Sequence, residues 1–141
     1  MMMREGFLRK GLLFLAAVCC MLVGTVSLAD STDIAWSYSC QSPEYWTAFR
    51  KKADTSKVYC HPESGHATYA TVYGSKTTSK TDSLSRSGRF KIPVGTRGYI
   101  TNYVKEKGDT YGALRLERTQ KDNTICKGEW SVDSRGTGTI Y

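Results

Sequence analysis

RGYITNYVKEKGDTYGALRLER, residues 97–118, is the stretch of sequence that decides the fold class. β-Forming residues flank a central Glu106-Lys107-Gly108-Asp109, and polar and apolar residues alternate on both sides of it. A four-residue connection that contains glycine and joins two alternating runs is typical of a β-hairpin. The sequence therefore predicts a half-buried antiparallel pair of strands here, within an all-β protein.

The two faces of the predicted hairpin differ in chemistry. The inner face carries four aliphatic residues, Ile100, Val104, Leu114 and Leu116. The outer face, which we name the tyrosine face, carries rings and cations: Tyr99, Tyr103, Lys105, Tyr111 and Arg115. Aromatic rings can lie against sugars or a membrane interface, and cations bind phosphate or carboxylate groups. The tyrosine face is the candidate binding surface, unless it packs on a second sheet as the inner face of a sandwich.

The first 29 residues have the pattern of a signal peptide for export. A basic start precedes an apolar run over residues 11–26, and Ser27-Leu28-Ala29 then offers small residues where signal peptidase cleaves. The apolar run is shorter than the roughly 20 residues that a membrane-spanning helix needs. We expect a signal-peptide helix in residues 1–29, removed before Asp30, and one secreted domain in residues 30–141.

The composition predicts many short strands around a thin core. Nine Tyr and three Trp offset a shortage of aliphatic residues, and Thr, Ser and Gly are frequent. Turn signals recur about every ten residues, the spacing of a sandwich or barrel. We therefore expect a small antiparallel β-sandwich or barrel of seven to nine short strands.

Two segments leave the secondary structure open. Residues 46–52 alternate like a strand, but Ser42-Pro43-Glu44 before them also resembles a helix start, so one helical turn is the alternative. The polar segment 74–88 is either a loop or a pair of edge strands, with Leu84 turned inward. Pro93 is expected to keep the strand before it at a sheet edge.

The net charge of +7 is moderate and scattered, and part of it belongs to the signal peptide. Such a charge suits an anionic cell-wall polymer or membrane surface, and equally a solvated protein surface. Nucleic acid is excluded as a partner, because an exported protein without a recognisable binding module does not fit one. No glycine-rich phosphate loop is present, so no cofactor is expected.

Three cysteines follow the predicted signal peptide: Cys40, Cys60 and Cys126. An odd number in an oxidising compartment allows at most one internal disulfide. Cys60 and Cys126 both end or follow apparent strands, so their pairing is the preferred prediction. Pairing of Cys40 with Cys60 remains open, and the leftover thiol is free, capped or used between molecules.

No residue pattern predicts catalysis. Cys60, His61 and His66 could supply three zinc ligands, but no fourth ligand completes the set, and a surface loop with incidental histidines explains them better. A side chain at position 61 points to the opposite face of a strand from Cys60, so it is badly placed as the base of a Cys-His pair. No G-x-S-x-G motif is found. We expect a protein that is not an enzyme.

Four segments resemble small exported all-β proteins of Gram-positive bacteria, of uncharacterised function, that end in G-x-W-S-x-D-S. The segments are Phe49–Lys52, Thr55–Tyr59, Tyr99–Val104 and Gly128–Ser134, and the resemblance covers most of residues 45–135. A looser likeness links the chain to lactococcin-type secreted bacteriocins through its signal peptide, size and basic Thr/Ser/Tyr-rich composition. This likeness implies a bacteriocin-like activity, but no functional residue carries over from it.

The sequence therefore favours a secreted, non-enzymatic protein that is bacteriocin-like or binds the cell envelope. One alternative is a structural or host-interacting surface protein that self-associates through edge strands or Cys40. A small secreted hydrolase is another alternative. The sequence leaves the oligomeric state open.

Overall fold

The structure, a computed structural model, describes residues 30–141. The predicted signal peptide, residues 1–29, lies outside the described residues. Over the part that is described, no helix is long and apolar enough to cross a membrane.

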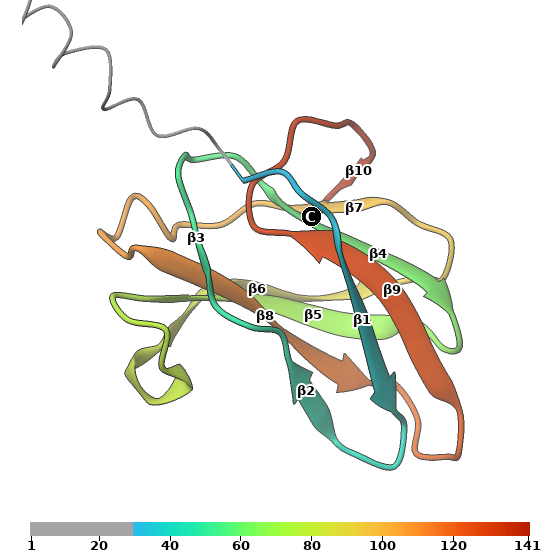
Figure 1. Ribbon diagram of the computed structural model, residues 1–141. Coiled ribbons are helices and arrows are strands. Elements are labelled where there is room, and N and C mark those ends of the chain that lie inside the picture. Colours follow the sequence, from blue (N-terminus) through green and yellow to red (C-terminus); the bar gives the residue numbers. More distant parts are fainter. Residues whose placement is uncertain (1–29) are drawn as a thin grey trace, which may run out of the picture.

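Two stacked β-sheets form the protein, which confirms the predicted all-β sandwich (Figure 1). Sheet A has the order β1-β9-β4-β7-β10, and sheet B has the order β2-β8-β5-β6, with β3 also paired to β8. The strands are β1 (Ile34–Ser39), β2 (Glu44–Trp46), β3 (Arg50–Lys51), β4 (Val58–Ser64), β5 (Thr68–Ser75), β6 (Leu84–Ile92), β7 (Gly98–Ile100), β8 (Tyr111–Arg118), β9 (Ile125–Ser131) and β10 (Thr139–Ile140). Most neighbours are antiparallel, but β10 runs parallel to β7.

The core fills the space between the inner faces of the two sheets. Alternation along each strand places one apolar set inward, as in β1, where Trp36 and Tyr38 are buried and their neighbours are not. Trp130 of β9 is the largest fully buried side chain. Aromatic rings thus supply much of the buried area that aliphatic residues supply in other domains.

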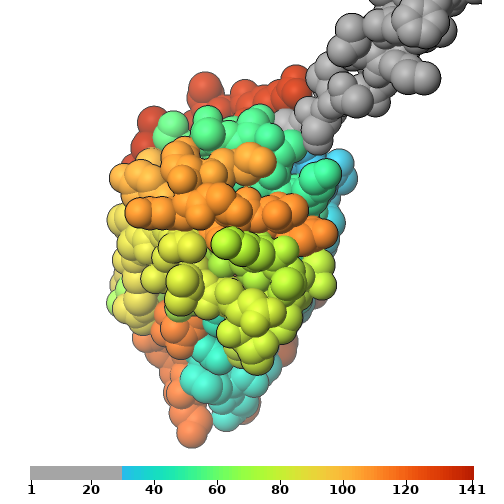
Figure 2. Space-filling model, turned by 90° about the vertical axis from the view of Figure 1, so that its left-hand side faces the viewer, coloured from blue at the N-terminus to red at the C-terminus, as the bar shows by residue number. Residues whose placement is uncertain are grey.

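The prediction of a β-hairpin over residues 97–118 is wrong. β7 pairs with β4 and β10 in sheet A, whereas β8 pairs with β2, β3 and β5 in sheet B. Strand pairing ends at Ile100, although the alternation of polar and apolar residues continues beyond it. Residues 101–110 instead carry the chain from one sheet to the other, and Figure 2 shows this crossing segment in orange on one side of the molecule.

Local hydrogen bonds explain why residues 101–110 do not continue the strand. The Asn102 amide donates to the Ile100 carbonyl at 3.1 Å, and its side-chain oxygen accepts from the Val104 N–H at 3.4 Å. Asn favours such bonds to backbone two residues away, which compete with a sheet ladder. Val104 is fully buried and packs residues 101–110 against the core. Gly108 closes the turn with a φ of +79°, a conformation that favours glycine.

Two smaller predictions also change. Residues 44–52 form neither one strand nor a helical turn: β2 and β3 pair separately with β8, and residues 47–49 lie between them. Leu84 does not turn inward, because it begins edge strand β6 and is 61% exposed. The edge position of β6 before Pro93 agrees with the prediction.

A buried ion pair joins the segment after β3 to the segment after β9. Lys52 Nζ donates to Asp133 Oδ1 at 2.9 Å and to the carbonyls of Ser56 and Val132, so all three of its hydrogens are used. Both charged side chains have no exposed surface. Asp133 Oδ2 also accepts the backbone N–H groups of Ala53 and Asp30. We name Asp30, Arg50, Lys52 and Asp133 the anchor cluster.

The anchor cluster gives the G-x-W-S-x-D-S segment a structural role. Asp133 is the Asp of this segment. The next residue, Ser134, donates its hydroxyl hydrogen to the Lys57 carbonyl at 2.6 Å. The Ser134 N–H in turn donates to Ser56 Oγ at 3.0 Å. The G-x-W-S-x-D-S segment thus binds the end of β9 to the segment before β4 through these hydrogen bonds.

Candidate functional site

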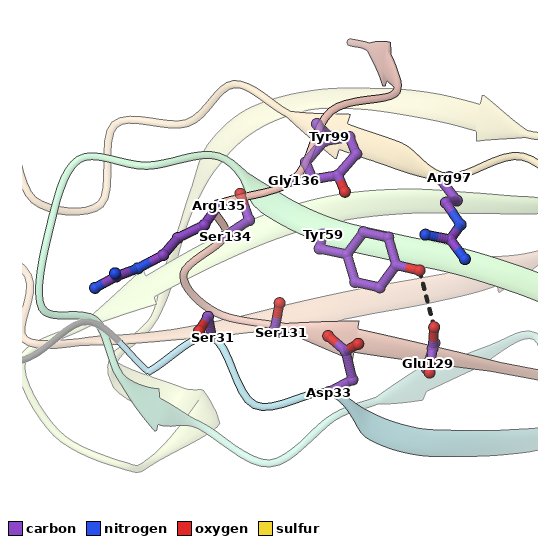
Figure 3. A pocket seen from close by; sticks show the side chains of 10 residues that line it. All are labelled: Ser31, Asp33, Tyr59, Arg97, Tyr99, Glu129, Ser131, Ser134, Arg135 and Gly136. Atoms are coloured by element: carbon purple, nitrogen blue, oxygen red, sulfur yellow. Dashed lines mark hydrogen bonds between the residues drawn. The ribbon is translucent and has the colours of Figure 1, made fainter.

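A hollow on the outer face of sheet A brings together charged, hydroxyl and aromatic side chains and is the candidate site. We name it the outer hollow; its volume is about 270 Å³. Figure 3 shows the residues that line it: Ser31, Asp33, Tyr59, Arg97, Tyr99, Glu129, Ser131, Ser134, Arg135 and Gly136. They come from β4, β7 and β9 and from the segments at both ends of the described chain.

Strand alternation and register bring the central residues of the outer hollow together. In β4, Cys60 faces the core, so its neighbour Tyr59 faces out. Tyr59 lies opposite Tyr99 of β7 on one side and opposite Ser131 of β9 on the other. The rings of Tyr59 and Tyr99 have centroids 5.3 Å apart and form one aromatic wall.

A hydrogen bond between Tyr59 and Glu129 defines one end of the outer hollow. The Tyr59 hydroxyl donates to Glu129 Oε1 at 2.8 Å, and Figure 3 shows the Arg97 guanidinium beside this pair. Burial, and then the Glu129 carboxylate, raise the pKa of Tyr59 above its ordinary value. The phenol therefore stays neutral at physiological pH and acts as a hydrogen-bond donor rather than as a base.

Two glycines let the C-terminal segment lie directly over Tyr99. A Cβ added at Gly136 would collide with the Tyr99 hydroxyl, and one added at Gly138 would collide with the Arg97 carbonyl and the Tyr99 ring. This close approach explains why Tyr99 is only 7% exposed although it lines the hollow.

A second hollow adjoins the outer hollow and has a different charge. It has a volume of about 360 Å³ and shares Tyr99, Ser134, Arg135 and Gly136 with the first. Its other lining residues are Ser56, Lys57, Thr137, Gly138 and Ile140. Two cations and four hydroxyl groups line it, and none of the described residues that line it is a carboxylate. We name it the cationic hollow.

Two other side-chain groups have the composition of metal sites. Donor atoms of Cys40, His66 and Asp122 lie within 4.8 Å of one another, as do those of His61, Glu63 and Glu129. In the first group the His66 Nε2 and Asp122 Oδ2 atoms already form a hydrogen bond of 2.6 Å. The zinc set considered from the sequence, Cys60 with both histidines, is not brought together.

The residues of the predicted tyrosine face do not form one surface. Tyr99 lies in sheet A, while Tyr111 and Arg115 lie in sheet B. Tyr103, 56% exposed, and Lys105 belong to the crossing segment. Arg115 is occupied by Glu44, with a 2.6 Å contact from its Nε. Only Tyr99 contributes to a hollow, because the hairpin that would have aligned the five residues does not exist.

The structure does not contain either cysteine pairing predicted from the sequence. Cys40, Cys60 and Cys126 are free and fully buried. Cys60 lies opposite Trp130 in the β4–β9 register, and Cys126 Sγ lies 3.3 Å from Cys40 Sγ instead. The β1–β9 register places Cys126 opposite Tyr38, two residues before Cys40, which brings the two sulfurs together.

Most of the residues that line the outer hollow are not among those predicted from the sequence. The alternating pattern indicates which side chains of two strands point outward. They are Tyr59 and His61 in β4, and Lys127, Glu129 and Ser131 in β9. The pattern did not show that β4 and β9 are neighbours, so the Tyr59–Glu129 bond could not be predicted.

The comparisons with known proteins identify a family without assigning an activity. No curated protein and no solved structure matches the chain. Residues 24–134 match a family model described as "Protein of unknown function (DUF2712)". This match agrees with the expected resemblance to proteins of uncharacterised function and spans most of the chain, from before β1 to just beyond the buried Asp133. The chain therefore belongs to the DUF2712 family.

Proposed function

We propose that the protein is an exported, non-enzymatic protein that binds an anionic glycopolymer of the cell envelope in the outer and cationic hollows. The observation that carries this proposal is the contact between two hollows of different chemistry along Tyr99 and Arg135. One hollow suits the hydroxyl groups of a sugar, and the other suits an acidic substituent.

The outer hollow supplies the groups that sugar recognition needs. Tyr59, Glu129 and Arg97 provide donors and acceptors at one end, and serine hydroxyls lie along the rest. The neighbouring Tyr59 and Tyr99 rings are 5% and 7% exposed, so they form a nearly buried base for these polar groups rather than a free face for stacking. A few polar and charged side chains that converge on one concave site are typical of ligand binding.

The cationic hollow supplies the charge for an acidic group. Lys57 and Arg135 are cations without a carboxylate among the described lining residues, so phosphate or carboxylate groups would be attracted there. The positive net charge of the chain adds a general attraction to anionic surfaces. A bacteriocin-like activity is the finer form of this proposal, with envelope binding as its first step.

Self-association is the second candidate, and the structure offers less for it. The long edge strand β6 carries Arg86, Arg89 and Lys91, and charges on an edge oppose strand-to-strand association. An intermolecular disulfide through Cys40 would need its sulfur at the surface, but Cys40 is fully buried. We propose instead that Cys40 and Cys126 form an internal disulfide in the exported protein.

Calorimetric titration of residues 30–141 with soluble anionic cell-wall polymer tests the proposed binding. We expect saturable binding that weakens at least tenfold in Arg135→Gln and in Lys57→Gln. Lys105→Gln is the matched control, because this exposed lysine lies in the crossing segment, outside both hollows. Absence of binding, or an equal loss in all three variants, would reject the proposed site.

A further inference from the structure

Asp30 lies against Asp133, the most buried carboxylate among residues 30–141. The Asp30 backbone nitrogen donates to Asp133 Oδ2 at 3.1 Å, and the Asp133 N–H donates back to the Asp30 carbonyl at 3.2 Å. Asp133 is fully buried. Figure 1 shows this meeting of the start of the chain, in blue, with the C-terminal segment, in red. Asp30 is also the residue before which the sequence predicts signal-peptide cleavage.

Among residues 30–141, the charges around this contact do not balance. The cations are Lys52, bonded to Asp133, and Arg50, whose guanidinium lies 2.7 Å from the Asp30 carboxylate. The carboxylates are Asp30, Asp133 and Asp54. Ser56 links the last two, because its N–H donates to Asp54 and its hydroxyl donates to Asp133. Three carboxylates therefore face two cations, and one more positive charge would balance them.

We propose that signal-peptide cleavage supplies this charge, because the new α-ammonium group of Asp30 forms an ion pair with Asp133. Hydrolysis adds water across the Ala29–Asp30 peptide bond, leaving a carboxylate on Ala29 and an amine on Asp30, which takes up a proton. The neutral N–H that contacts Asp133 Oδ2 thereby becomes a cation in the same place. The inference rests on the predicted cleavage position and is independent of polymer binding.

The ion pair has a consequence for the outer hollow. Ser31 and Asp33 line that hollow and follow Asp30 directly in the chain. An α-ammonium group held by a buried carboxylate fixes the start of this segment, because a charged donor binds a carboxylate more strongly than a neutral amide does. Processing would thus complete one wall of the hollow only in the exported protein.

The first experiment determines where the mature protein begins. The full chain is expressed with its own signal peptide in a secreting host, and the N-terminus of the released protein is read by mass spectrometry. We expect Asp30 as the first residue. Any other mature N-terminus would overturn the proposal.

The second experiment compares the chain that begins at Asp30 with one that begins at Ala29, each made by tag removal. The two chains carry the same net charge, but the α-amine of the second is displaced by one residue. An ion pair raises the pKa of an amine, so we expect the Asp30 chain to react with an acylating reagent at its α-amine at least about tenfold more slowly, the factor for one pKa unit. Its urea unfolding midpoint should also be higher.

The sign of the pH dependence adds a further check. A group with a raised pKa in the folded state stabilises the protein below its unfolded pKa, about 8 for an α-amine, and loses this effect as the pH rises through the folded value. The difference in midpoint should therefore be present at neutral pH and vanish in alkaline solution. Asp30→Asn, which removes the Arg50 contact but keeps the α-amine, should retain the slow acylation. Equal acylation rates and equal midpoints for the two chains would refute the ion pair.

Discussion

Replacing Lys52 by methionine tests how much the anchor cluster contributes to the stability of the fold. Methionine keeps most of the length of the lysine side chain and removes its charge and its three hydrogen-bond donors. The change would leave Asp133 as a buried carboxylate without its cation, and would remove a donor from the carbonyls of Ser56 and Val132. The two backbone N–H groups that donate to Asp133 would remain.

The expected cost follows from the burial of both charged groups. Neither side chain has exposed surface, so solvent cannot compensate for the missing partner. Removal of one member of a buried ion pair typically costs about 3–5 kcal/mol. A single small domain is stable by only about 5–15 kcal/mol, so Lys52→Met should lose a large part of the total free energy of unfolding.

Urea unfolding followed by tryptophan fluorescence measures this loss. Lys51→Met is the matched control, because Lys51 is the exposed neighbour in β3, and its replacement should change stability by no more than about 0.5 kcal/mol. In the double variant Lys52→Met with Asp133→Asn, the unpaired charge is gone, so the total cost should be smaller than the sum of the two single costs. A Lys52→Met protein within about 1 kcal/mol of the Lys51→Met control would refute the reasoning.

Three further predictions concern the thiols, a close packing contact and acid stability. The protein refolded from its reduced, unfolded state in the presence of oxidised glutathione should lose two hydrogen atoms in mass through a Cys40–Cys126 bond, the glutathione disulfide being reduced to two thiols; three titratable protein thiols after denaturation would contradict this. Gly128→Ala should lower the free energy of unfolding by about 1–3 kcal/mol in urea titration, since the added Cβ would meet a β4 carbonyl and an indole ring; unchanged stability would show that the sheet yields there. Burial raises the pKa of Glu44, but the Arg115 hydrogen bond and charge outweigh it, so the pKa lies below its ordinary value. The resulting stabilisation is lost as the pH falls below about 4, and Glu44→Gln should show a smaller loss of thermal stability between pH 6 and pH 3 than the unchanged chain.

Alternation in the sequence was sufficient to predict the fold class and most strands. β1, β5 and β9 lie where alternating β-branched and aromatic residues predicted them, because burial of one face per strand imposes a period of two. The hairpin prediction failed because residues 101–105 keep that alternation while Asn102 forms a local turn. Local pattern does not distinguish a strand from a crossing segment when both bury every second residue.

The anchor cluster and the hollows depend on contacts that the sequence pattern does not encode. Arg50-Lys51-Lys52 resembles a solvated basic run, yet Lys52 is buried because Asp133, distant in the chain, supplies its counter-charge. The outer hollow requires the pairing of β4 with β9 and of β4 with β7, which sets Tyr59 beside Tyr99 and within reach of Glu129. Outward positions could be predicted from the sequence, but strand neighbours could not.

Backbone amide NMR of residues 30–141 during titration with soluble anionic cell-wall polymer tests the central claim most directly. The account predicts chemical-shift changes concentrated at residues that line the two hollows: Lys57, Tyr59, Arg97, Tyr99, Ser131 and Ser134 to Gly138. Shifts confined to Tyr103 and Lys105 in the crossing segment, or no shifts at saturating polymer, would contradict it.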